Sequence, residues 1–309
     1  MVAAVFFPGL ITMGLYLILA VWAERKLAAK VQWRYGPLYV SEKLGGVLQT
    51  VADLLKLAFS ELVVPSYTNR ALFAALPAVV FFVEALPLLF IPGGPGLVMI
   101  PSGYGLLYVV AIILISTPAV VAMAWAEADK FTFIGLLREL LLEAAYEVPL
   151  VLSLLAMALV YGTDLSTYAQ GLPGIAVNPV AFFVYLVATA MATSRFPFEI
   201  PDADAEIVLG PYTEYGSSLF LLAYGSNYVK LYAMALLGAL VFLGGWAPLA
   251  GIAGIAVYIL KASALTAFWL LLRAVYPRMR IDQALRLGWR ELLFLSAAAV
   301  GVSALWRLW

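Results

Sequence analysis

The sequence predicts an all-α polytopic membrane protein, and three observations support this prediction. The chain has 309 residues, of which 65% are hydrophobic, and its mean hydropathy of +1.00 is higher than soluble globular domains show. Its apolar segments are long enough to cross a bilayer as helices, which takes about 20 residues each. Segments of about ten alternating residues, which are typical of membrane β-barrels, do not occur in it. We expect a single transmembrane domain over residues 1–309.

Eight apolar segments make up most of the chain. We expect membrane spans at roughly 2–30, 70–91, 102–126, 131–161, 178–194, 218–245, 250–275 and 289–308. The first segment lacks a basic N-terminal region and is too long for a signal peptide, so we expect it to stay as a span. A further, amphipathic helix is expected over about 44–62, because apolar residues recur there at helical spacing while Asp53, Lys56 and Ser60 occupy other faces. This helix is predicted to lie along the membrane surface.

Lysine and arginine are distributed unequally between the loops. The loops at 31–69, 127–130, 195–217 and 276–288 lie on one side of an eight-span bundle and hold Arg34, Lys43, Lys56, Lys130, Arg195, Arg278, Arg280 and Arg286. The loops at 92–101, 162–177 and 246–249 hold no Lys or Arg. The positive-inside rule therefore predicts that the first set is cytoplasmic and that both termini are outside. We expect a multi-pass protein of the plasma membrane.

Two missing residue types narrow the possible chemistry. The chain has no cysteine and no histidine, which excludes iron–sulfur clusters, zinc thiolate sites and haem ligated by either residue. Redox chemistry must then be done by a partner, and proton chemistry must use carboxylates, Lys, Arg, Tyr or water. The net charge is zero, so nothing favours nucleic-acid binding.

Acidic residues gather in the loop between the fifth and sixth spans. The segment 195–215 reads RFPFEIPDADAEIVLGPYTEY and contains Glu199, Asp202, Asp204, Glu206 and Glu214. Charged residues are only 12% of the chain, so a membrane protein keeps such a cluster where it meets water, a partner or a proton path. At the start of this segment Arg195 precedes Phe196 and Phe198. A cation beside aromatic faces suits a flat ring headgroup.

The fourth span contains a column of acids. Glu139, Glu143 and Glu147 are spaced i, i+4 and i+8 and share one helix face. Ionisable groups inside a membrane usually mark a function, so the column predicts a proton or hydration path. The alternative is that these acids form salt bridges with Arg138, Lys230 or Lys261.

Other ionisable residues in or near the spans remain open to two interpretations. Glu84 either continues the acid path or makes a structural hydrogen bond. Lys261 needs a carboxylate partner or loses its proton, and it belongs either to the relay or to a structural pair. The basic residues that end the first span are either a positive-inside stop signal or the lining of a cavity mouth.

Four blocks of the chain resemble a known family. The first contains Glu24–Lys26, Gln32–Pro37 and Leu48–Lys56, and the second AEADKFTFIGLLR and Tyr146–Leu150. The third is TSRFPFEIPDADAEIVLGPYTEY, and the fourth joins Phe242–Trp246 to Leu271–Trp289. In this order, and over nearly the whole chain, they resemble the H subunit of respiratory complex I, the membrane subunit that forms the quinone channel.

The resemblance implies a membrane-anchor and quinone-channel subunit of a complex I-like oxidoreductase, which couples quinone reduction to proton or sodium translocation. Quinone would bind at an interface with a partner subunit, and this chain would carry no redox centre, metal or haem. The implied partners are peripheral iron–sulfur and quinone-site subunits on the cytoplasmic side, small membrane subunits, antiporter-like subunits and lipid. The electron donor stays open between NADH, ferredoxin and a reduced deazaflavin.

The resemblance also implies roles for individual residues. Residues matching the tunnel mouth are Glu24, Arg25, Arg34, Asp53 and Lys56, and Glu147 matches the family's acid in the second block. Combined with the acids found above, the expected quinone-binding residues are Arg25, Arg34, Lys56, Arg195, Phe196 and Phe198. The expected proton-relay residues are Asp53, Glu139, Glu143, Glu147, Glu199, Asp202, Asp204, Glu206 and Glu214.

Several positions depart from the family pattern. Ala192 and Asn227 stand where the family has acids, and Tyr212 replaces a histidine. Glu139 and Glu143 replace residues that are usually uncharged, so we expect them to compensate for the two missing acids in a divergent, archaeal-like branch. Two other functions are weighed: the anchor of a membrane-bound hydrogenase-type complex without quinone, and a stand-alone cation transporter. The retained PFxxPxAxxE pattern favours the quinone enzyme over the hydrogenase anchor.

Overall fold

The computed structural model describes residues 2–308, and the side chains of all of these except positions 2, 204, 205 and 308. Within that range the chain forms helices and no β-strand. The all-α fold class predicted from composition is therefore confirmed. Each of the eight predicted spans contains one main helix: α2 (Leu10–Val31), α4 (Arg70–Ala85), α5 (Gly105–Ala126), α6 (Lys130–Tyr161), α8 (Pro179–Ala192), α10 (Ser217–Val241), α11 (Gly251–Val275) and α13 (Leu293–Leu308).

Shorter elements connect these helices. The amphipathic segment forms α3 (Leu48–Phe59), which is shorter at both ends than the predicted 44–62. Single turns of helix occur at α1 (Val2–Val5), α7 (Gly174–Val177) and α9 (Asp204–Ile207), and α12 (Ile281–Arg286) continues through a π-helical turn at 287–292 into α13. Short 3₁₀ turns lie at Leu86–Leu89, Thr167–Ala169 and Gly210–Tyr212.

Six helical segments of the described chain are long and apolar enough to cross a membrane: Ala3–Val31, Arg70–Leu89, Gly105–Ala126, Lys130–Tyr161, Gly251–Val275 and Ile281–Arg307. The other two predicted spans are helical but do not meet both conditions. α8 has 14 residues, and a helix of that length is about 21 Å long, shorter than the roughly 30 Å of hydrocarbon in a bilayer. α10 has 25 residues but carries polar groups such as Asn227 and Lys230.

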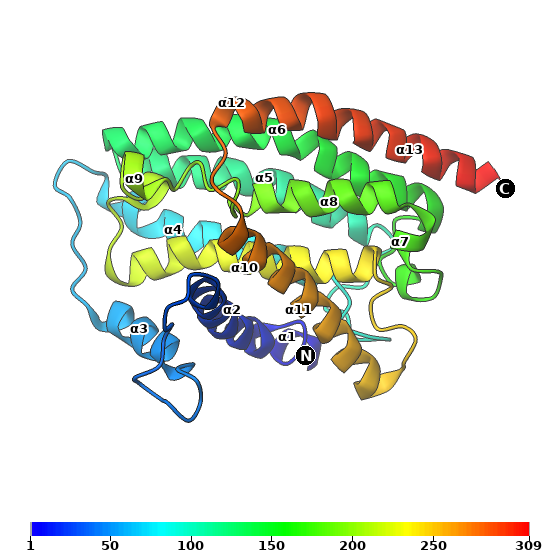
Figure 1. Cartoon of the computed structure of the whole chain (residues 1–309), viewed down its shortest axis with the longest axis horizontal. Helices are drawn as coiled ribbons and strands as arrows, with labels where there is room; N and C mark the ends of the chain where they lie inside the picture. The colour runs from blue at the N-terminus through cyan, green and yellow to red at the C-terminus, as the bar shows by residue number, and fades with distance from the viewer. Residues whose placement is uncertain (1, 309) are drawn as a thin grey trace.

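α10 runs through the middle of the bundle. Every residue from Tyr228 to Val241 is buried, and α10 packs against α4 and α11 as well as α2 and α3. Figure 1 shows α8 and α6 above it and α2 below it, with α13 lying along α6. Because residues 228–241 of α10 are buried, the polar side chain of Lys230 contacts other helices.

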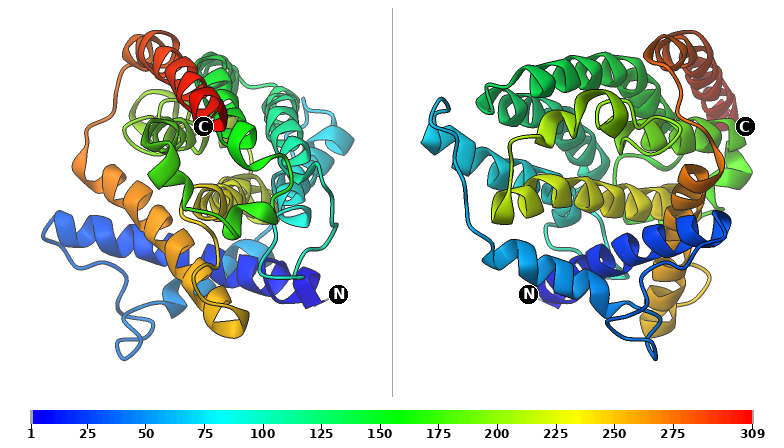
Figure 2. Two further views of the ribbon diagram at one scale, coloured as in Figure 1. Left: turned by 90° about the vertical axis from the view of Figure 1, so that its right-hand side faces the viewer. Right: turned by 60° about the vertical axis from the view of Figure 1, so that its left-hand side comes forward.

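Many of the connecting loops gather at two ends of the bundle (Figure 1). The end that carries α3, α9 and residues 193–216 is called here the α3 end, and the end that carries α7 and residues 242–250 the α7 end (Figure 1). At the α3 end Ser217 Oγ donates to the Ser60 carbonyl at 2.7 Å. At the α7 end the Ile175 amide donates to the Phe242 carbonyl at 2.9 Å. α3 itself lies outside the main bundle, beside α2 (Figure 2).

Lys261 differs from what the sequence predicted. Among the described residues, neither a carboxylate partner nor a place in the acid relay is found for it. Its Nζ donates to three backbone carbonyls, those of Leu243, Gly245 and Ala247, at 2.7, 2.9 and 2.7 Å. These carbonyls belong to the loop that follows α10, and the C-terminus of a helix favours a nearby positive charge. The ammonium therefore fixes the 242–250 loop at the α7 end.

We predict that Lys261→Met destabilises the protein by at least about 2 kcal/mol, since hydrogen bonds to charged groups contribute about 1.5–3 kcal/mol each. The measurement is the thermal unfolding temperature of the detergent-solubilised protein. Lys130→Met is the control, because Lys130 is exposed at the start of α6. An unchanged unfolding temperature in Lys261→Met would contradict the assignment.

Candidate functional site

One buried carboxylate joins several elements near the α3 end. Glu24 on α2 is 4% exposed. Its Oε2 accepts hydrogen bonds from Arg195 Nη1 at 2.7 Å and from the Tyr228 hydroxyl at 2.9 Å, and its Oε1 forms an ion pair with Arg273. Arg273 also pairs with Glu199 at 3.2 Å. These five residues are called the Glu24 network.

The network balances its own charge. Two carboxylates face two guanidiniums, and α2, α10, α11 and the loop after α8 each supply at least one member. Breaking a buried ion pair by removing one partner costs about 3–5 kcal/mol, because the remaining charge is left uncompensated. The network therefore fixes the relative positions of helices that are far apart in sequence.

Arg195 sits against a different aromatic ring from the one predicted. Its guanidinium carbon lies 4.5 Å from the centre of the Tyr228 ring, whereas the Phe196 ring lies 5.7 Å from the guanidinium of Arg273. Phe198 is 3% exposed and belongs to the main apolar core. The Nε of Arg195 is buried and has no hydrogen-bond acceptor among the described residues.

The residues predicted at the tunnel mouth lie on α2, α3 and the loop between them. Arg25 Nη1 lies 2.5 Å from Asp53 Oδ2 in a partly exposed ion pair. Arg34 Nε donates to the Gln32 side chain at 2.7 Å, and Lys56 is exposed on α3. The Arg25–Asp53 pair attaches α3 to α2 next to the Glu24 network.

The predicted acids of the 195–215 loop do not form one cluster. Glu199 belongs to the Glu24 network, and Glu206 pairs with Arg138 on α6 at 2.6 Å and with Arg278. Hydrogen bonding from Arg138 lowers the pKa of Glu206. The negative charge of Asp202 acts on the buried Tyr212 hydroxyl. Asp204 begins α9, and its side chain lies outside the part of the chain that the structure describes.

The predicted relay residue Glu214 lies at the corner between α5 and α6, beside Glu127, which was not predicted as a site residue. The buried Glu127 accepts hydrogen bonds there from the Thr132 hydroxyl at 2.8 Å and the Glu214 backbone amide at 2.9 Å. Its Oε1 is buried without a partner, and burial raises the pKa of Glu127 to about 8. The sequence could have indicated Glu127, because it is an acid that directly follows an apolar span.

Close packing holds the same loop against α6. A Cβ atom at Gly135 of α6 would lie 2.7 Å from the Gly210 Cα. Gly210 has a φ of +53°, a conformation that favours glycine.

Two of the residues that depart from the family pattern are in contact. Asn227 Nδ2 donates to the Tyr212 hydroxyl at 3.0 Å.

The acid column of α6 faces a lysine. Glu143 is 5% exposed and its Oε2 has no hydrogen-bond partner, while Ser194 Oγ donates to Glu139 Oε2 at 3.4 Å. Lys230 of α10 lies 3.5 Å from Glu84 of α4, and its charge acts on the acids of the column. Of the three bases considered as partners, Lys230 is the one that faces these acids.

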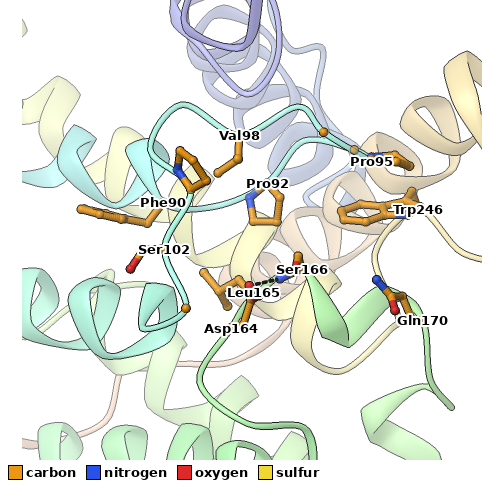
Figure 3. A pocket seen from close by; sticks show the side chains of 14 residues that line it. Phe90, Pro92, Pro95, Val98, Ser102, Asp164, Leu165, Ser166, Gln170 and Trp246 are labelled. Carbon is orange, nitrogen blue, oxygen red and sulfur yellow. Dashed lines mark hydrogen bonds between the residues drawn. The ribbon is translucent and has the colours of Figure 1, made fainter.

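A separate cavity of about 670 Å³ opens at the α7 end. Figure 3 shows Trp246, Pro95 and Phe90 around it, with Asp164 on one wall accepting a hydrogen bond from the Ser166 amide. It lies at the opposite end of the bundle from the Glu24 network. Asp164, the ionisable member of its lining, already closes a turn of its own loop, so we do not include this cavity in the candidate site.

Comparison with known proteins identifies the family. A family model described as NADH dehydrogenase matches residues 4–304. The chain belongs to the H-subunit family of NADH-quinone oxidoreductase. It is 35% identical to the H subunit of the NADH-quinone oxidoreductase of Geobacillus sp. (strain WCH70), over 97% of this chain and 94% of the relative. The corresponding H subunit of Dehalococcoides mccartyi (strain CBDB1) is 33% identical over 93% of this chain and 81% of its own length.

The family assignment confirms the resemblance drawn from the four sequence blocks. This subunit is a multi-pass membrane protein and belongs to a complex I-type enzyme, whose other subunits are its partners. The Arg195–Glu24 ion pair joins the third block to the first, and the Arg25–Asp53 pair joins two parts of the first block. Tyr228 and Arg273 complete the network and were not predicted as site residues.

We predict that the contact at Glu127 weakens as pH rises. Its pKa is raised from the ordinary 4.5 to about 8, so the folded contact favours the protonated form, and stability falls as pH increases between these two values. The measurement is hydrogen exchange of the segment 210–216 in the assembled protein, corrected for the intrinsic effect of pH. Glu127→Gln should show protection that no longer depends on pH in this range. An equal slope in both proteins would contradict the prediction.

Proposed function

We propose that this subunit forms the membrane wall of a quinone site and passes the electrostatic effect of quinone reduction into the acid column of α6. The observation that carries the proposal is the Glu24 network. It places two guanidiniums, two carboxylates and a tyrosine against aromatic rings at the α3 end. Quinone, when bound, supplies a group that takes up electrons from a partner subunit together with protons.

The residues of the network fit a quinone headgroup. The unpartnered Nε of Arg195 is a buried donor, and a quinone carbonyl oxygen is an acceptor of the matching kind. The rings of Phe196 and Tyr228 offer flat apolar faces, as ligand pockets usually do. Phe198 supports this loop from within the core. We propose that Arg25, Arg34, Lys56 and Asp53 line the entrance, where α3 lies beside α2.

Ser194 supplies a physical route from this site to the acid column. It precedes Arg195 directly, and its hydroxyl donates to Glu139 at 3.4 Å. A change of charge beside Arg195 alters the proton affinity of nearby carboxylates and moves a residue that touches the first acid of the column. Glu139, Glu143 and Glu147 then continue along α6 over about 12 Å of helix axis.

The remaining acids of the 195–215 loop serve this route in different ways. Glu199 shares Arg273 with Glu24. Asp202, Asp204, Glu206 and Glu214 are proposed to carry protons between the cytoplasm and the network. We further propose that the α3 end faces the cytoplasm, where peripheral iron–sulfur subunits dock, and that both termini lie outside the plasma membrane. Small membrane subunits and antiporter-like subunits are proposed as the further partners within the bilayer.

We predict that Arg195→Lys raises the Michaelis constant for quinone by about tenfold or more. Loss of a hydrogen bond to a charged group costs about 1.5–3 kcal/mol, and lysine reproduces neither the planar fork nor the stacking of arginine. The measurement is quinone reduction by the intact complex, together with the affinity of a quinone-analogue inhibitor. Arg290→Lys at an exposed position is the control. Unchanged values for both quantities would refute binding at Arg195.

We predict that Glu143→Gln leaves electron transfer partly intact but lowers the number of protons released per quinone reduced. Glutamine keeps the size of the side chain and removes its titration. The measurement is proton release by the complex in proteoliposomes, with Glu61→Gln, an exposed acid at the α3 end, as the control. Unchanged pumping stoichiometry would show that the column is not on the coupling route.

A further inference from the structure

A single lysine lies among four acids inside the bundle. Lys230 is 6% exposed on α10, and its Nζ is 3.5 Å from Glu84 on α4, which is 5% exposed. The charges of Glu139 and Glu143 also act on Lys230, as Lys230 does on Glu147. The buried hydroxyl of Tyr146 on α6 faces the same acids. These four acids and Lys230 are called the Lys230 cluster.

Among the described residues, no cation other than Lys230 is found paired with these four carboxylates. Arg138, at the start of the column, is bound to Glu206, and Lys261 is held by carbonyls at the α7 end. With all four carboxylates ionised, three of them would lack a countercharge. An unpaired carboxylate at the centre of a bilayer costs about 2.5–3.5 kcal/mol on insertion scales, and neighbouring like charges repel. The cluster is therefore expected to hold one ionised carboxylate at a time, with protons on the other three.

The structure provides room for one water molecule beside Glu84 and Lys230. A cavity of about 10 Å³ is lined by Glu84 and Lys230 together with Pro87 and apolar residues of α5 and α10. This is near the minimum of roughly 10–15 Å³ that one water molecule needs. On the α6 side, Glu143 Oε2 is buried without a hydrogen-bond partner, which makes it a position where a carboxyl can take up or lose a proton.

We propose that Lys230 is a fixed positive charge about which the one ionised carboxylate alternates between Glu84 on α4 and Glu143 on α6. In the transfer, the O–H bond of the Glu143 carboxyl breaks and an O–H bond forms on the Glu84 carboxylate, with a water molecule as the carrier. Lys230 keeps its proton throughout, and the total charge of the cluster does not change. This inference rests on the proposed coupling function and identifies the group that controls it.

The test uses the intact complex in proteoliposomes with the variants Lys230→Met, Lys230→Arg and the exposed control Lys130→Met. Lys230→Met should keep quinone reduction and lose proton release, while Lys230→Arg, which keeps the charge, should retain part of it. Because Lys230→Met leaves Glu84 without its partner, the double variant Lys230→Met/Glu84→Gln is included. It should assemble and reduce quinone without releasing protons.

Each result has a defined meaning. Full proton release per quinone in Lys230→Met or in the double variant would overturn the proposal, as would a Lys230→Arg complex as uncoupled as Lys230→Met. If Glu143→Gln uncouples the enzyme but Lys230→Met does not, the acid column functions without Lys230. If neither variant changes coupling, the proposed function fails as well.

The unmodified complex provides a second test that does not depend on variant assembly. Before quinone reduction, the infrared spectrum should contain bands of protonated carboxyl groups. Difference spectra on quinone reduction should then show paired loss and gain of such bands as the proton moves. These paired bands should be missing in Glu84→Gln and in Glu143→Gln. A resting spectrum without protonated carboxyl bands from the buried acids would overturn the proposal.

Discussion

The ion pair between Glu24 and Arg195 is the interaction on which the arrangement of the α3 end depends. The two residues are 171 positions apart in the chain, and Tyr228, which shares the same carboxylate oxygen, is 204 positions from Glu24. Lipid gives helices no hydrophobic reason to associate, so polar contacts and close packing must select which helices meet. Here a buried carboxylate brings α2, α10 and α11 together and fixes the start of the 195–215 loop. The site and the fold therefore depend on the same side chains.

The bundle neutralises its buried charges in three different ways. Glu24 is matched by two guanidiniums, one of which is itself shared with a second carboxylate. Lys261 is matched by three backbone carbonyls. In the Lys230 cluster the acids outnumber the base, so protons must supply the remaining balance. In the Glu24 network and around Lys261, every charge has its partner, which suits a structural role. The Lys230 cluster can exist in several protonation states of equal total charge.

Much of the fold followed from sequence patterns, because apolar length and helical periodicity are local properties. A main helix forms in each of the eight predicted segments, and six helical segments of the described chain are long and apolar enough to cross a membrane. Lys261 was misjudged because backbone carbonyls can surround an ammonium, and residue types alone do not show where carbonyls converge. Tyr228, Arg273 and Glu127 were missed because their importance comes from partners more than 80 positions away or in a loop whose path the sequence does not specify.

Ser194 and Arg195 are joined by one peptide bond, yet they touch different parts of the machinery, Glu139 on one side and Glu24 on the other. Consecutive Cα atoms are about 3.8 Å apart, so these two contacts are mechanically tied over a very short distance. In the coupling proposed above, communication from Arg195 to the membrane interior needs no sliding of whole helices. A rotation of the Ser194–Arg195 dipeptide would be enough to change both contacts. Such a small movement would let the surrounding core keep its packing during every turnover.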